Sequence, residues 1–203
     1  IHQVNKRNIG VRLNTEATPE MIRAEGFDRV VAALGSVPAK PPIKGMDRTD
    51  ILTGLDAMMD VERAGQRVVV IGGGEVGVEA GIHLAKTGRT VTVLEMRSKL
   101  AADSTMMHFR SMFKEYWESI PTFSGICGVK VTEIKENGVC YEDENGVSQF
   151  IECDTVVVST GMKARNAEAL AFYGSADRFH MIGDCKKPAT VQNAMREAFA
   201  AAA

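Results

Sequence analysis

The stretch RVVVIGGGEVGVEAGIHLAKTGRTVTVLE, residues 67–95, decides the fold that this sequence can adopt. Its first part, residues 67–71, is short and rich in valine, as buried strands are. A glycine-rich turn follows, and apolar residues then recur at helical spacing until Gly88. Residues 90–95 have the pattern of a second strand. The stretch therefore predicts a β-α-β unit of about 30 residues, in which the two buried strands run parallel.

The glycines of this unit fit the pattern G-x-G-x-x-G. The pattern is weak by itself, but here a strand precedes it, a helix follows it, and the next strand ends on Glu95. We expect Gly72 to make the tight turn, Gly74 to let a pyrophosphate approach the backbone, and Gly77 to let the helix pack against the strand. The helix N-terminus would then present free N–H groups to the phosphates. The predicted cofactor-binding residues of the turn are Gly72, Gly73, Gly74, Glu75, Val76 and Gly77.

Glu95 is expected to determine whether the site prefers NADH or NADPH. Its carboxylate would accept hydrogen bonds from the ribose hydroxyls of an adenosine and would repel the additional phosphate of NADPH. Arg97 and Lys99 lie close by and weaken that discrimination. We predict that NADH is preferred over NADPH, with Met96 and Arg97 beside the nucleotide.

The glycine turn has other interpretations. A Walker loop needs Gly-Lys-Ser/Thr, which the turn lacks. A kinase glycine loop would need valine in place of Glu79 and would not open a helix. An S-adenosylmethionine site stays open, because it also uses a glycine turn and a carboxylate after the next strand. A glycine-rich turn that binds nothing stays open as well.

Composition narrows the function classes. The 203 residues are enough to bury a core without disulfides or metals. The 24 basic and 26 acidic residues give a net charge of −2, which argues against a nucleic-acid partner. No apolar run is long enough for a membrane span. Four cysteines without a C-x-x-C pair indicate reduced thiols in a cytoplasmic protein, and four scattered histidines predict no metal site.

The rest of the chain predicts alternating helices and strands. Apolar and polar residues alternate at 10–14, which predicts a half-buried strand. Thr18 would cap a short helix that Gly26 ends. Residues 1–7 predict no element, and because the chain begins with Ile1 we expect a piece of a longer polypeptide. Further strands are expected at 28–34, 129–135, 138–142, 147–151, 154–160 and 179–182, with Asn-Gly turns at 137–138 and 145–146, and further helices at 53–63, 103–118 and 190–200.

A weak internal repeat indicates two related units. DRVVAALG, residues 28–35, resembles DTVVVSTG, residues 154–161: each has an acidic residue, an apolar strand and a terminal glycine. The proline-rich segment SVPAKPPIKG follows Gly35 and has the composition of a stiff connector between domains. One α/β unit inserted into another accounts for both features.

Four motifs in order resemble a known family: VVAALGSVPAKPPIKG, VVVIGGGEVGVEAG, DTVVVSTG and HMIGDC. They are similar to the two-dinucleotide-binding flavoproteins, the pyridine-nucleotide oxidoreductases of the glutathione and thioredoxin reductase type. The strongest resemblance is to the C-terminal part of NADH:flavin oxidoreductases of the old yellow enzyme group, which includes 2,4-dienoyl-CoA reductase, trimethylamine dehydrogenase and enoate reductases.

The resemblance implies an α/β architecture in which a Rossmann-like NAD(P)-binding domain is inserted into an incomplete FAD-binding domain of related fold. Residues 46–161 would form the NAD(P)-binding domain. Residues 1–45 and 162–203 would be the two parts of the FAD-binding domain. The family's first glycine fingerprint would lie before residue 1, so we expect this chain to hold FAD poorly or not at all.

The resemblance also implies site residues. Asp184 resembles an aspartate that hydrogen-bonds the FAD ribityl chain, with Gly183 allowing the approach, and Glu79 matches a glutamate near the nicotinamide. The glycines that end the repeated strands, Gly35 and Gly161, complete the predicted set. Plainer roles stay open: Asp184 as a turn cap and Glu79 as a helix-terminal charge.

The expected function follows from these parts. The chain would be an NADH-binding, FAD-associated electron-transfer module that passes hydride from NADH to flavin, and a fragment inactive alone. Its partner would be an upstream FMN and iron–sulfur barrel domain of the same polypeptide. No side chain is predicted to act as an acid, a base or a redox thiol, Cys185 included. The alternative is a non-catalytic nucleotide-binding module with a vestigial FAD or ADP site, and the oligomeric state stays open.

Overall fold

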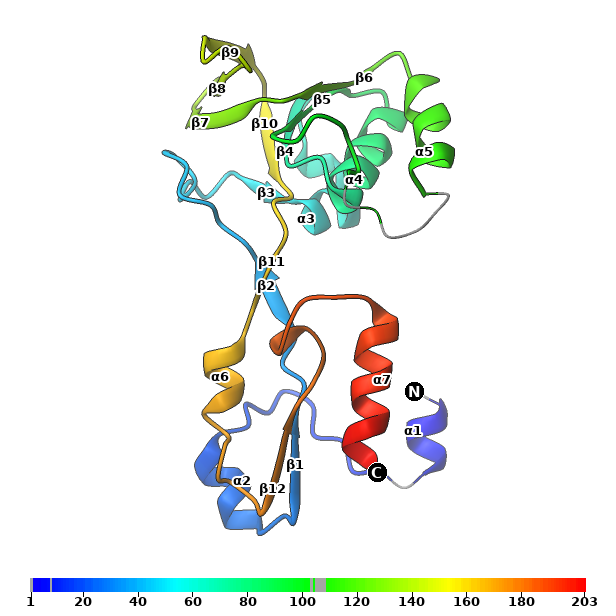
Figure 1. Ribbon diagram of the computed structural model, residues 1–203, viewed down its shortest axis with the longest axis vertical. Coiled ribbons are helices and arrows are strands. Elements are labelled where there is room, and N and C mark those ends of the chain that lie inside the picture. Colours follow the sequence, from blue (N-terminus) through cyan, green and yellow to red (C-terminus); the bar gives the residue numbers. More distant parts are fainter. Residues whose placement is uncertain (1, 8, 103, 105–108) are drawn as a thin grey trace. The chain divides into compact units, whose positions relative to one another are not determined.

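The computed structural model describes residues 2–7, 9–102, 104 and 109–203 (Figure 1). The chain divides into two compact units. One comprises Pro38–Lys163, and the other comprises Ile1–Val37 together with Ala164–Ala203.

The unit Pro38–Lys163 is built on a five-stranded sheet in which every pairing is parallel. The strand order is β3-β10-β4-β5-β6, which places β4 at the centre (Figure 1). The strands are β3 (Leu52–Thr53), β10 (Thr155–Val158), β4 (Arg67–Ile71), β5 (Thr90–Glu95) and β6 (Phe123–Cys127). The carboxyl ends of these strands therefore meet at one edge of the sheet, where ligands bind in open α/β folds.

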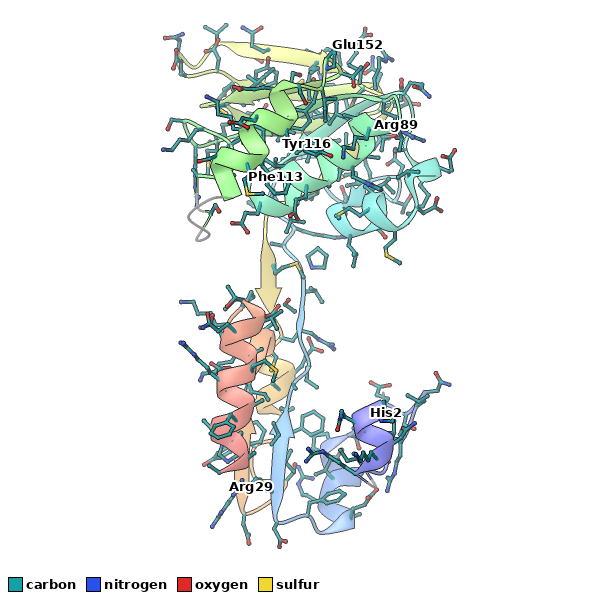
Figure 2. The ribbon with its side chains drawn as sticks, turned by 90° about the vertical axis from the view of Figure 1, so that its right-hand side faces the viewer. His2, Arg29, Arg89, Phe113, Tyr116 and Glu152 are labelled. Atoms are coloured by element: carbon teal, nitrogen blue, oxygen red, sulfur yellow. The ribbon has the colours of Figure 1, made fainter. Side chains whose placement is uncertain are left out.

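Both faces of this sheet are buried. Val68 and Val70 of β4 belong to one core cluster, with helices α3 (Gly54–Met59), α4 (Glu75–Lys86) and α5 (Phe109–Glu118) on that face; η1 (Val61–Arg63) follows α3. Figure 2 shows Phe113 and Tyr116 of α5 beside α4, where Tyr116 contacts Lys86. The alternate residues of β4, Val69 and Ile71, belong to a second cluster on the other face. This two-sided burial explains the unbroken valine run.

An antiparallel three-stranded sheet covers that second face. It consists of β7 (Lys130–Lys135), β8 (Gly138–Glu142) and β9 (Ser148–Glu152). The two Asn-Gly pairs have different roles. Gly146 has φ +74°, as a tight turn requires, whereas Gly138 lies in β8, where a Cβ would be 2.3 Å from the Ile151 carbonyl oxygen. Gly138 is therefore needed for the close approach of β8 and β9, and not for a turn.

The other unit has a small parallel sheet of β1 (Arg29–Ala32) and β12 (Arg178–Met181). Its core is the cluster of Ala32, Ala169 and Cys185, with Leu34, Phe179 and Met181 packed against it. Its helices are α1 (His2–Lys6), α2 (Pro19–Glu25), α6 (Asn166–Leu170) and α7 (Val191–Ala202), with the short η2 (Gly183–Cys185). Two short strands, β2 (Ser36–Pro38) and β11 (Met162–Ala164), pair where the chain passes between the units.

Local signals predicted several elements well. The bounds of β4, β5 and β8 are those expected, and α2 has the predicted ends. Thr18 accepts a hydrogen bond from the Met21 amide, and Gly26 is left-handed at φ +68°. The repeat also holds, because β1 and β10 are each followed by a glycine with positive φ, Gly35 and Gly161.

Other predictions were wrong. No strand forms at 10–14, where Val11 and Leu13 are exposed. The chain start, expected to lack an element, contains α1, and β6 and α6 were not predicted. Of the helix expected at 103–118, residues 109–118 form α5. Asp103 or Ser104 was expected to cap it, and because residues 103 and 105–108 lie outside the described residues, the cap stays a prediction. Among the residues that are described, no helix has the length and apolar character needed to cross a membrane.

Candidate nucleotide-binding site

The turn after β4 can only be made by glycine. Gly72 has φ +104°, and its amide donates a 2.9 Å hydrogen bond to the Leu94 carbonyl of β5. A Cβ at Gly72 would lie 2.4 Å from the carbonyl oxygen of Ser159, just after β10. The turn is therefore wedged between the ends of two neighbouring strands, at the carboxyl edge of the sheet.

Gly77 lets the helix begin directly against that turn. A Cβ at Gly77 would lie 1.9 Å from the Gly72 carbonyl oxygen, which is a severe overlap. The packing expected of Gly77 thus agrees with the geometry, while its contact with a cofactor remains a prediction.

The N-terminus of α4 has no side-chain cap. Its cap residue is Gly74, which has no side chain that could accept a hydrogen bond. The first amides of the helix therefore have no partner from the cap. Such amides, together with the positive end of the helix dipole, can bind an anion; that they bind a pyrophosphate here stays a prediction. Val76, the second residue of α4, is exposed.

Two carboxylates lie in the first two turns of α4. Glu75 Oε1 is buried and has no hydrogen-bond partner within the described part of the chain. Burial, and after it the negative charge of Glu75, raise the pKa of Glu79 above its ordinary value. Glu75 was included in the predicted site only as a member of the turn, and its unpaired oxygen is visible only in the structure.

Glu95 binds the glycine turn through its carboxylate. Oε2 accepts a 2.6 Å hydrogen bond from the Gly73 amide, and Oε1 accepts a 2.7 Å hydrogen bond from the Arg97 amide. An ionised carboxylate has about four acceptor positions. Two are therefore used within the protein, and the remaining ones can accept ligand hydroxyl groups.

The segment 96–101 lies over the same turn. Met96, Arg97 and Lys99 are exposed, but Leu100 is buried and contacts Gly73. The Ala101 amide donates a 2.7 Å hydrogen bond to the Gly73 carbonyl. Leu100, Ala101 and Ser159 were not predicted as site residues, because no local pattern marks them; only the fold brings them to the turn.

The predicted flavin residues lie in the other unit. Gly183 has φ +64°, and its amide donates to Glu197 at 2.7 Å. Asp184 accepts a 3.1 Å hydrogen bond from the Ser36 hydroxyl and a 3.3 Å one from the Ala189 amide. These bonds agree with the plainer role of Asp184 in holding a turn. The structure thus gathers the predicted nucleotide residues at one sheet edge, with Gly183, Asp184 and Gly35 in a separate unit.

Other side-chain chemistry is limited. Among the described residues, no three His, Cys, Asp or Glu side chains gather as a metal site would require. None of the four cysteines forms a disulfide, and the Cys185 thiol donates to the Ala32 and Ile182 carbonyls inside its core cluster. Burial raises the pKa of the Cys153 thiol to about 11, so this cysteine is a core residue too.

Comparison with known proteins agrees with this geometry. Residues 10–198 match the model of the pyridine nucleotide-disulphide oxidoreductase family. The chain is 28% identical to the metal reductase of Desulforamulus reducens, over 95% of this chain and 34% of that protein. It is 31% identical to the bilirubin reductase of Mediterraneibacter gnavus, over 99% of this chain and 31% of that protein.

A solved structure of a reductase is also similar to this chain. A 2-naphthoyl-CoA reductase complex has a TM-score of 0.87 with this chain at 31% identity, covering 98% of this chain and 30% of the other. The chain thus spans about a third of the length of these relatives. The resemblance to NADH:flavin oxidoreductases of the old yellow enzyme group is confirmed, and the methyltransferase alternative is not supported. By its motifs, its fold and the match over residues 10–198, the chain belongs to the pyridine nucleotide-disulphide oxidoreductase family, whose members bind FAD and NAD(P)H.

Proposed function

We propose that this chain is the NADH-binding, FAD-associated electron-transfer module of a larger flavin oxidoreductase. Residues 46–161 form the nucleotide domain, and residues 1–45 and 162–203 contribute to the flavin domain. Bound NADH would supply a hydride, and a bound flavin would accept it. The protein's own part is to bind and orient the two cofactors, and none of its side chains needs to act as an acid or a base.

One observation carries the nucleotide part: the acidic end of β5 and the glycine turn are joined by the Glu95–Gly73 hydrogen bond. This bond holds a carboxylate beside an uncapped helix N-terminus. A dinucleotide requires both features together, since its pyrophosphate is an anion and its ribose hydroxyls are donors. A ligand N–H group would also satisfy the buried Glu75 Oε1.

The fixed position of Glu95 supports a preference for NADH. Two backbone amides hold the carboxylate, so it cannot swing away from a ribose 2′-phosphate without losing both bonds. A phosphate there would face a negative charge at short range. The backbone amide of Arg97 is already committed to Glu95.

Features of the other unit support a partner within the same polypeptide. A two-stranded sheet is marginal by itself, and the unit containing β1 and β12 exposes a row of apolar residues on α7. Val191, Met195 and Phe199 form this row at four-residue spacing, the most exposed being Phe199 at 81%. We propose that the remainder of the flavin domain covers this face, and that an FMN and iron–sulfur barrel domain precedes it. Four cysteines without a disulfide support a reducing, cytoplasmic location.

Hydrogen exchange on the intact 203-residue chain tests the nucleotide part. NADH is expected to slow amide exchange in residues 72–79 and 95–101, while FAD is expected to leave exchange near Gly183 unchanged. Absence of any NADH-dependent protection at the turn would contradict the proposal.

The alternative of a nucleotide module without electron transfer gives a separate outcome. The coding sequence upstream of Ile1 distinguishes the two cases. A second G-x-G-x-x-G that follows a strand pattern supports electron transfer to FAD, and a complete upstream sequence without one supports the non-catalytic module.

A further inference from the structure

Leu100 occupies space that two glycines leave open. A Cβ at Gly73 would lie 2.6 Å from Leu100 Cδ2, and a Cβ at Gly125 would lie 2.7 Å from Leu100 Cδ1. Gly73 lies in the glycine turn, whereas Gly125 lies on β6, the outermost strand of the sheet next to β5. One buried side chain, 7% exposed, therefore touches both the turn and a strand that lies outside the predicted site.

The residue after Leu100 fixes this arrangement through its backbone. Ala101 has φ +49°, a left-handed conformation that alanine rarely adopts, and only 1% of its surface is exposed. A non-glycine residue stays in this region only when its surroundings hold it there, and such positions gather at functional sites. The Ala101 amide donates to the Gly73 carbonyl at 2.7 Å, while the Gly73 amide donates to Glu95. Gly73 is thus held on both sides.

We propose that Leu100 is a positioning residue of the nucleotide site: it sets the position of the glycine turn, and Gly125 on β6 in turn sets the position of Leu100. The inference rests on the proposed function of the turn as the pyrophosphate site. Binding groups must be held within about 0.5 Å of their productive geometry. A shift of the turn would move the amides at the start of α4 and the Gly73 bond to Glu95 together.

Gly125→Ala tests this without altering any predicted contact residue. The three atoms nearest to the added Cβ all belong to Leu100, so that side chain is driven toward Gly73. We expect the Kd for NADH, measured by calorimetry on the intact chain, to rise about ten-fold. Leu100→Ala removes most of the side chain that lies between Gly73 and Gly125, and it should raise the Kd for NADH about five-fold.

The double variant Gly125→Ala/Leu100→Ala separates positioning from general damage. With Leu100 shortened, the alanine Cβ has room, so the Kd should fall back to within about two-fold of that of Leu100→Ala alone. Leu100→Met keeps the volume and should bind NADH like the unchanged chain. Gly10→Ala is the matched glycine control, because no atom lies within 4 Å of its added Cβ.

The outcomes are distinct. An unchanged NADH Kd in Gly125→Ala, or a double variant in which the two losses multiply, would overturn the role of Leu100. If Gly125→Ala does not fold, Leu100→Ala with an unaltered circular dichroism spectrum decides, and an unchanged Kd in that variant overturns the inference. No NADH binding by the unchanged chain would overturn the proposed function and this inference with it.

Discussion

The carboxylate of Glu95 accepts a 2.6 Å hydrogen bond from the backbone amide of Gly73, so the end of β5 is joined directly to the glycine turn after β4. This bond converts two separate sequence signals, a glycine cluster and an acidic residue, into one structural unit. Glu95 therefore holds the glycine turn in addition to the ribose contact that we propose for it.

Glu95→Ala should weaken NADH binding and reduce discrimination against NADPH. Hydrogen bonds to a charged group contribute about 1.5–3 kcal/mol, so we expect the NADH Kd to rise roughly ten- to a hundred-fold. Parallel calorimetric titrations with both nucleotides measure the effect. Unchanged affinity for both would mean that Glu95 does not contact the ribose.

Glu95→Gln should be nearly as harmful as Glu95→Ala, although it is closer in shape. Both carboxylate oxygens accept from backbone amides, those of Gly73 and Arg97. A glutamine must face one of these donors with its own NH₂ group. A glutamine variant that binds NADH like the unchanged chain would show that these two bonds do not shape the site.

Gly77→Ala should destabilise the fold and abolish NADH binding. Its Cβ would lie 1.9 Å from the Gly72 carbonyl oxygen, and backbone must move to accommodate it. Overpacking of this kind costs about 1–3 kcal/mol of unfolding free energy. Thermal unfolding measures the melting temperature of Gly77→Ala. Gly10→Ala is the control and should melt like the unchanged chain. Equal melting temperatures for Gly77→Ala and Gly10→Ala would contradict the packing described here.

Glu79→Gln should raise stability at neutral pH and lose that advantage in acid. Burial raises the pKa of the Glu79 carboxyl in the folded state, so the folded chain binds its proton more tightly than the unfolded chain does. Stability therefore falls as the pH rises from the unfolded value, about 4.3, through the folded pKa. The difference in melting temperature should be positive at pH 7 and shrink toward zero below about pH 4. Glu144→Gln, at an exposed hairpin tip, is the control, and a Glu79→Gln difference that does not vary with pH would contradict the argument.

Cys153 should resist alkylation in the folded chain. Burial raises the pKa of its thiol to about 11, so at pH 8 only about one molecule in a thousand carries the reactive thiolate. Cys127 and Cys140 are half-buried and should react first with iodoacetamide, as peptide mass analysis can follow. Labelling of Cys153 as fast as Cys140 would contradict its place in the core.

The sequence predicted the parts of the fold that local chemistry specifies. The strand–turn–helix–strand unit needs glycines, a valine run and an acidic end, and each of these is visible within 67–95. The caps of α2 are equally local, since Thr18 and Gly26 act on the helix between them.

The remaining parts depend on long-range partners. β6 contains Ser124 and Gly125, which are weak strand formers, and it exists because β5 pairs with it in parallel register. The opposite error occurred at 10–14, where an alternating pattern forms no strand and leaves Val11 and Leu13 exposed. Leu100 and Ser159 reach the glycine turn through the fold alone, so no spacing rule could have identified them.

A calorimetric titration of the intact 203-residue chain with NADH, repeated with NADPH and in the presence of FAD, tests directly whether the glycine turn and Glu95 bind NADH. We expect NADH binding with a Kd of about 1 μM, weaker NADPH binding, and no dependence on FAD. Absence of heat with either nucleotide, or equal affinity for both, would contradict the assignment of the glycine turn and Glu95 to NADH.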